Sequence, residues 1–166
     1  MSTAFVFRAT LVMSLFVPLL HAQQAAANSS TATCNLDDGR QVYIRYTPVP
    51  SNKEKISNGK PWSPGGTPMT LFTEAQLTLG SSLIPIGAYT VYPIPGRDHW
   101  TLVVNKNVTP GASYDEKSDL ARAPMDTGQV PDPAETLELA FAHVGNKCSL
   151  RIYYGKSAAF ADFFAK

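Results

Sequence analysis

The chain has 166 residues, of which 44% are hydrophobic and only 16% are charged, a composition that suits one folded domain and argues against disorder. Lys and Arg number 14 against 13 Asp and Glu, so the formal net charge is only +1. We therefore expect no nucleic-acid partner and no purely electrostatic attachment to a membrane.

The first residues have the layout of a secretory signal peptide. Arg8 precedes an apolar stretch over residues 9–20, and small residues follow up to Ala27. We predict a signal peptide over residues 1–27, cleaved near Ala22 or Ala27, and a protein that is exported to the periplasm or secreted. The alternative is an uncleaved anchor, but about 12 apolar residues are fewer than the roughly 20 needed to span a bilayer. We expect no transmembrane segment in the mature chain.

Both cysteines, Cys34 and Cys148, follow this leader. An oxidising compartment would preserve a disulfide between them, and we predict that pair. The alternative is a reactive or metal-binding thiol pair, but neither cysteine has the CxxC or zinc-ligand spacing. We therefore predict no metal site, and no cofactor, because neither GxxxxGK nor GxGxxG occurs.

Short apolar runs punctuated by Gly and Pro follow the leader, as is typical of antiparallel sandwiches and barrels. We predict an all-β fold, an antiparallel β-sandwich or jelly-roll-like single domain over residues 34–166, preceded by a disordered spacer over residues 28–33. The first strand is expected over residues 41–47, where Val42, Ile44 and Tyr46 share one face. Residues 48–68 carry five prolines and three glycines, which predicts a long surface connection.

The second half of the chain predicts a hairpin, a loop and further strands. Residues 88–94 and 99–105 flank a short turn, and the alternation places Trp100, Leu102 and Val104 in the core. Residues 109–133 are predicted to be loop-rich, with at most a short strand near 119–123. Residues 136–142 favour a strand over a helix, residues 148–154 alternate clearly, and residues 157–166 fit either a last strand or a terminal turn.

Several ordered segments resemble the exported bacterial family catalogued as domain of unknown function 2911. They are Ile-Pro-Ile-Gly-Ala-Tyr-Thr-Val-Tyr-Pro-Ile-Pro-Gly over residues 84–96, Trp-Thr-Leu-Val-Val-Asn-Lys over residues 100–106, Tyr114 with Asp-Leu-Ala-Arg over residues 119–122, and Cys-Ser-Leu-Arg-Ile over residues 148–152. The resemblance implies an antiparallel β-rich fold and an envelope location, and it implies no particular activity.

One stretch departs from that family. Relatives show Trp-Arg-x-Gly-Ala-Asn-Glu-Ala-Thr, whereas residues 62–70 here are Trp-Ser-Pro-Gly-Gly-Thr-Pro-Met-Thr. Arg, Asn and Glu are thus replaced by Ser63, Thr67 and Pro68, which remove charges and donors. A role that this stretch has in relatives is therefore expected to be lost or altered here.

No group of residues forms a catalytic signature, so we predict no catalytic residue and lean away from an enzyme. The many aromatic residues either pack the core or form a ligand platform. Our candidates for ligand binding are Trp62, Tyr89, His99 and Arg122.

The sequence is compatible with three functions. The first is a non-enzymatic envelope module that binds a neutral glycan, lipid or protein partner. The second is a hydrolase-like enzyme with a site around the Trp62 loop and the His99 hairpin. The third is a purely structural domain without a small ligand.

Overall fold

Most of the described chain forms β-strands, in which buried and exposed side chains alternate. The computed structural model describes residues 29–166, so the signal peptide predicted over residues 1–27 lies outside the described residues. Two short 3-10 turns, η1 (Pro64–Gly66) and η2 (Glu116–Ser118), interrupt the strands. The strands are β1 (Ser30–Asn35), β2 (Gln41–Tyr46), β3 (Met69–Thr73), β4 (Leu77–Leu79), β5 (Ser82–Ile84), β6 (Gly87–Ile94), β7 (Trp100–Asn105), β8 (Asp119–Val144) and β9 (Lys147–Ala165).

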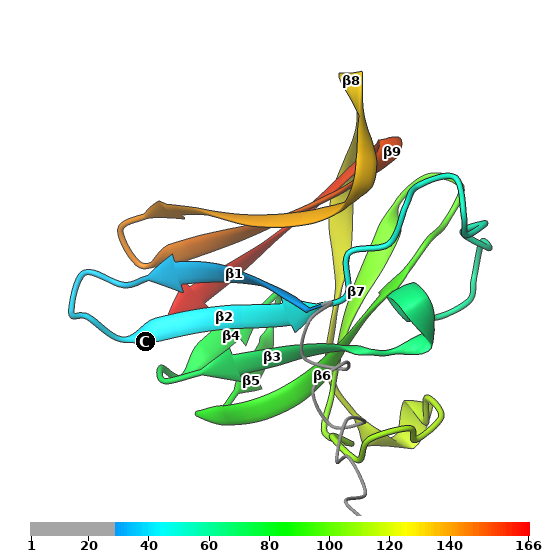
Figure 1. Ribbon diagram of the computed structural model, residues 1–166. Helices are drawn as coiled ribbons and strands as arrows, with labels where there is room; N and C mark the ends of the chain where they lie inside the picture. Colours follow the sequence, from blue (N-terminus) through cyan, green and yellow to red (C-terminus); the bar gives the residue numbers. More distant parts are fainter. Residues whose placement is uncertain (1–28) are drawn as a thin grey trace, which may run out of the picture.

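All neighbouring strands are antiparallel, in the order β1-β2-β3-β6-β7-β8-β9-β4-β5. The long strand β8 belongs to two layers, because its first part up to Met125 pairs with β7 and the part from Asp126 onward pairs with β9. The ribbon of β8 and β9 arches over β1, β2 and β3 (Figure 1). The predicted antiparallel all-β fold is confirmed, and β6 and β7 form the predicted hairpin.

The core lies between the two layers. Leu102 and Val104 of β7 are fully buried, as predicted, and Trp100 is partly buried against them. Burial of side chains such as these supplies the main favourable term in folding, roughly 1.5–3 kcal/mol for each large apolar group. Fully buried side chains come from both layers, among them Ile44, Leu71, Leu102, Leu137, Leu150, Ile152 and Phe163.

A disulfide joins the two layers, as predicted. Cys34 lies on the terminal strand β1, and Cys148 lies at the start of β9. The two Cα atoms are 6.1 Å apart and both side chains are buried. The bond therefore ties an edge strand of one layer to the arched ribbon of the other.

The prediction of a disordered spacer over residues 28–33 is wrong for residues 30–33. These residues belong to β1, which pairs with β2 along its whole length. Thr31 and Thr33 face outward while Ala32 is buried, and threonine favours extended structure. The neighbouring strand β2 supplies the backbone partners that a polar segment lacks when it is considered alone.

The short strand expected near residues 119–123 is confirmed as the start of β8, whereas the prediction of a loop is wrong for residues 124–133, which continue the same strand. Prolines argued for a loop, but Pro131 and Pro133 lie in a bulge. Gln129 faces Ser157 and Ala134 faces Gly155, so residues 130–133 leave the hydrogen-bonded ladder. The missing N–H groups of these prolines therefore cost no hydrogen bond there. The strand alternatives for residues 136–142 and 157–165 are confirmed, since both segments lie in long strands.

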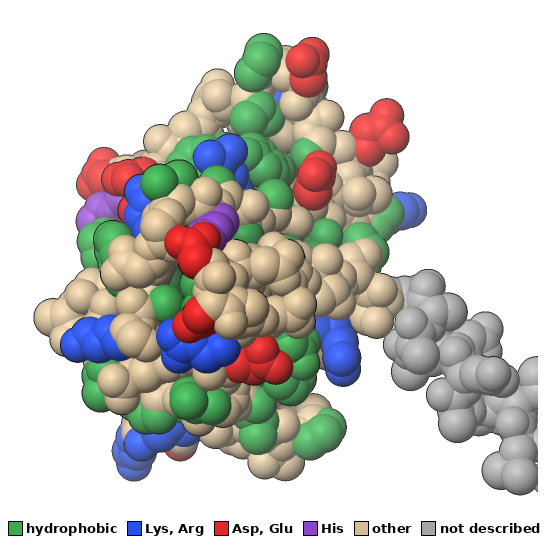
Figure 2. Space-filling model, turned by 90° about the vertical axis from the view of Figure 1, so that its left-hand side faces the viewer, with side chains coloured by type: hydrophobic (Ala, Val, Ile, Leu, Met, Phe, Trp, Pro, Cys, Tyr) green, Lys and Arg blue, Asp and Glu red, His purple; other side chains and the backbone are tan. Residues whose placement is uncertain are grey.

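Within residues 29–166, no helix has the length and apolar character needed to cross a membrane. At the end of the sandwich that carries the β1–β2 and β8–β9 turns, acidic and basic side chains are interspersed (Figure 2). This end therefore has no large patch of one sign, in keeping with the balanced charge of the sequence.

Candidate functional site

Trp62, the first predicted ligand-binding residue, packs inside the protein. Only 7% of its surface is exposed, and its ring meets Tyr154 at a centroid distance of 4.9 Å and Trp100 at 6.4 Å. Its indole Nε1 donates a hydrogen bond to Glu54 Oε2 at 3.0 Å, and the other oxygen of this carboxylate accepts from the backbone N–H of Gly65 at 2.7 Å. Trp62 therefore anchors the Pro-rich connection to the core and presents little surface to a ligand.

Within residues 29–166, none of the other three predicted residues makes a hydrogen bond, ion pair or ring contact with Trp62 or with another of the three. Tyr89 is buried on β6, and its hydroxyl donates to the backbone oxygen of Pro85 at 2.9 Å. This burial raises the pKa of Tyr89. His99 is exposed beside the β6–β7 turn, and its imidazole makes no hydrogen bond or ion pair with any residue that the structure describes. The structure thus does not bring the four predicted residues together.

Arg122 belongs to a polar cluster that holds the loop of residues 106–118 against the outer face of β6 and β7. Its guanidinium pairs with Glu116 at 2.5 Å and with Asp119 at 3.4 Å. The Tyr114 hydroxyl and the Asn105 amide each donate to Asp119 at 2.7 Å. These groups are already paired with one another. The cluster therefore holds the loop in place and offers few unpaired groups to a ligand.

Tyr114 makes the stability that this cluster contributes depend on pH. Burial, and then its hydrogen bond to Asp119, raise the pKa of Tyr114 above its ordinary value. A tyrosine whose pKa is raised on folding stabilises the protein fully below its unfolded pKa, about 10, and loses that contribution as the pH rises further. We expect Tyr114→Phe to lower the free energy of unfolding by about 1–2 kcal/mol at pH 8 and by less at pH 11. Urea unfolding at both pH values tests this, and equal differences at the two pH values would contradict it.

The outer face of β1, β2 and β3 combines aromatic, hydroxyl and guanidinium groups. The strand register aligns their side chains in two neighbouring rows. We call these six residues the Arg45 face. One row is Thr31, Arg45 and Thr70, and the other is Thr33, Tyr43 and Phe72.

The aromatic residues of the Arg45 face are partly exposed. Tyr43 and Phe72 are stacked, with ring centroids 4.8 Å apart and an interplanar angle of 16°. The Arg45 guanidinium lies over the Phe72 ring, 5.5 Å from its centroid. Stacking of this kind limits the rotamers of the aromatic rings and of the arginine. The face therefore presents a partly ordered set of apolar and donor groups to solvent.

A hollow of about 640 Å³ adjoins the row that contains Arg45. This volume is within the range of small-molecule sites. Five of the lining residues bear aliphatic hydroxyls, and Arg45 is the one charged residue of the lining. The lining residues are Ser29, Thr31, Arg45, Tyr46, Thr47, Thr67, Pro68 and Thr70.

This hollow includes part of the stretch that departs from the family pattern. Thr67 and Pro68 of that stretch lie in the lining together with Thr70. The sequence placed Tyr43 and Arg45 on the polar face of a strand, but it did not single them out as a site. The sequence did hold one indication of this surface. Tyr43 and Arg45 alternate with the inward-facing residues Val42, Ile44 and Tyr46, so both side chains had to lie on the outer face of the strand.

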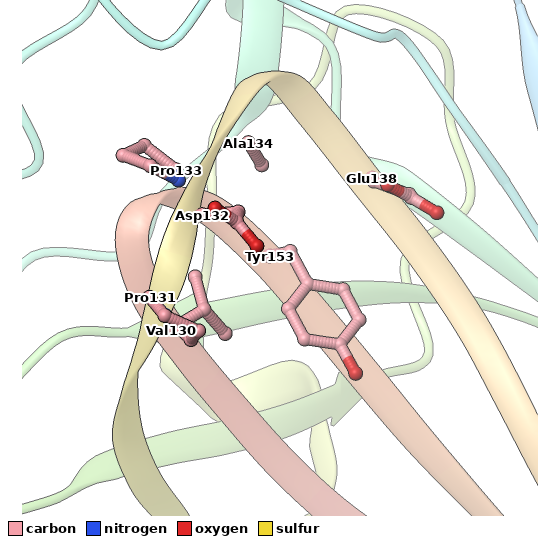
Figure 3. Close-up of a pocket in the computed structure, with 7 residues that line it drawn as sticks. All are labelled: Val130, Pro131, Asp132, Pro133, Ala134, Glu138 and Tyr153. Carbon is pink, nitrogen blue, oxygen red and sulfur yellow. The ribbon is translucent and has the colours of Figure 1, made fainter.

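A second hollow, of about 490 Å³, lies at the bulge of β8 (Figure 3). Asp132 and Glu138 line it together with the Tyr153 ring. Both carboxylates are exposed to water, so neither is in the desolvated setting that acid–base catalysis uses. Within residues 29–166, no cluster of three or more His, Cys, Asp and Glu residues could hold a metal ion.

Comparison with known proteins places the chain in a family. No curated protein and no solved structure is significantly similar to it. One family model, described as a protein of unknown function (DUF2911), matches residues 28–161, which include β1 to β8 and most of β9. On this match, the chain belongs to the DUF2911 family.

Proposed function

We propose that the protein is an exported, non-catalytic binding module that holds a glycan on the Arg45 face. The observation that carries this proposal is the stacked Tyr43–Phe72 pair beside a hydroxyl-lined hollow of about 640 Å³. Sugar rings offer apolar C–H surfaces that pack on aromatic side chains, and hydroxyls that pair with polar side chains. The face offers both kinds of group within two neighbouring rows.

The lining of the hollow favours a glycan over a lipid. Lipid tails need a predominantly apolar site, whereas Pro68 and the ring of Tyr46 are the only lining groups without an aliphatic hydroxyl or a charge. The Tyr46 hydroxyl is also occupied, because it accepts a hydrogen bond from the Leu139 backbone at 3.3 Å. Of the partner classes predicted from composition, the glycan therefore has the best support.

Export rests on the disulfide and the leader together. A bond between Cys34 and Cys148 persists in an oxidising compartment such as the periplasm or the medium. The signal peptide predicted over residues 1–27 supplies the route to either compartment.

The hydrolase-like alternative has less support. It required Trp62 and His99 in one site, but Trp62 is buried and His99 lacks a described partner that could orient it as a base. Measurements of oligosaccharide binding distinguish the purely structural domain from the binding module.

We expect Phe72→Ala and Tyr43→Ala each to weaken glycan binding roughly tenfold, because each removes ring surface from the face. An array of oligosaccharides identifies the ligands of the wild-type protein, and titration calorimetry then measures the affinity of each variant. Phe160→Ala is the matched control, because Phe160 is also partly buried and also lies against another ring, that of Tyr153 on β9.

The control should bind as the wild type does, and circular dichroism should show that all three variants keep their β-structure. Wild-type protein that retains no oligosaccharide would overturn the binding module and favour the purely structural domain. Equal losses in Phe160→Ala and Phe72→Ala would show that the Arg45 face is not the site.

A further inference from the structure

Arg45 brings a positive charge to the Arg45 face that the surrounding side chains do not balance. Like Arg97 and Arg151, and unlike Arg40 and Arg122, it makes no ion pair with any residue in the described part of the chain. Its cross-strand neighbours in the row, Thr31 and Thr70, are both uncharged. The exposed guanidinium is therefore available to pair with an anionic group of a ligand.

Arg45 lies where the aromatic pair and the hollow adjoin. Its guanidinium is held over Phe72 at 5.5 Å, and the same residue lines the hollow beside Thr31 and Thr70. A guanidinium is planar and its N–H donors lie in that plane, where they can pair with a carboxylate through two parallel hydrogen bonds. The flanking threonine hydroxyls can bind the hydroxyls of the same ligand.

The size of the hollow argues against a simple inorganic ion as the ligand. About 640 Å³ is far more space than an ion needs, and most of the lining consists of hydroxyl-bearing side chains. A ligand that matches the whole surface has one anionic group, several hydroxyls and an apolar ring face.

We propose that the ligand is an acidic glycan, whose uronate carboxylate is bound by Arg45 while its rings lie against Phe72 and the hydroxyl-lined hollow. This inference rests on the proposed glycan-binding function and names the ligand class of that site. It replaces the neutral ligand expected from overall composition, because the net charge of a chain does not report the charge of one face.

The test compares ligands that differ only in charge. Trisaccharides of galacturonate, glucuronate and mannuronate are each titrated into the exported protein beside their methyl esters, which keep the ring and remove the negative charge. We expect at least one uronate to bind, and its ester to bind at least about tenfold more weakly. Binding of the acid should also weaken as salt is raised, because the pair is partly screened at an exposed site.

Variants of Arg45 separate its charge from its geometry. Arg45→Gln should bind the acid and the ester almost equally, and Arg45→Lys should recover only part of the preference because an ammonium lacks the planar fork. Arg151→Gln is the matched control, since it removes one charge from an exposed position on β9 without touching the Arg45 face.

The outcomes distinguish this inference from the proposed function. If a uronate and its ester bind equally, or if neutral oligosaccharides bind and Arg45→Gln has no effect, the acidic ligand is wrong and the glycan-binding module stands. If neither the uronates nor any oligosaccharide on the array binds, both proposals are wrong.

Discussion

Replacing Cys34 and Cys148 together with alanine is expected to lower the free energy of unfolding by about 4–5 kcal/mol, close to the chain-entropy value for so long a loop. The two residues are 114 positions apart, and the loop closed between them contains most of the domain. Their bond also holds β1, which is the last strand at its end of the sheet order, against the β8–β9 ribbon. Urea unfolding of the double variant and the wild type measures the difference.

Alanine is the suitable replacement because both sites are buried, and a serine hydroxyl would add a desolvation cost of its own. Wild-type protein unfolded in a reducing agent is the control, and it should lose a similar amount of stability with no change of sequence. A loss of less than about 1 kcal/mol in both measurements would show that the bond adds little constraint to the unfolded chain.

Replacing Trp62 with alanine is expected to cost about 3–5 kcal/mol, the range measured for large aromatic residues in a core. The substitution removes the ring contacts with Trp100 and Tyr154 and leaves the Glu54 carboxylate without the indole donor. Glu54 also fixes the backbone of Gly65 and so shapes the connection that leads to the hollow. Thermal and urea unfolding measure the effect.

Trp62→Phe separates packing from hydrogen bonding at this position. Phenylalanine keeps part of the ring surface and removes only the Nε1 donor, so it should cost clearly less than alanine. If Trp62→Ala left stability unchanged while glycan binding was lost, Trp62 would be a ligand platform and its anchoring role would be wrong.

Much of the fold could be predicted from the pattern of side chains along the chain. A period of two over residues 41–47, 99–105 and 148–154 indicated strands, because successive side chains of a strand point to opposite faces. Two cysteines after a predicted secretory leader indicated a disulfide. Where the pattern failed, at β1 and in the middle of β8, the residues were polar or proline and depended on neighbouring strands or a bulge.

The candidate site could be predicted less well from the sequence than the fold could. Alternation placed Tyr43 and Arg45 on the outward face of their strand, but it could not place Phe72 beside them, since that requires the pairing of β2 with β3. For Trp62, a Pro-rich setting is compatible with both an exposed platform and a buried anchor. Contacts with Trp100 and Tyr154, which lie far along the chain, decide between them.

By itself, the sequence of this protein determined the strands with a clear period of two, the covalent pairing of its cysteines and the near-neutral charge of the whole chain. Only the tertiary structure decided which outward side chains form one surface and which aromatic residue is buried. The physical reason is that local alternation depends on each residue and its near neighbours, whereas a surface depends on strand order and register, which arise from the packing of the whole domain.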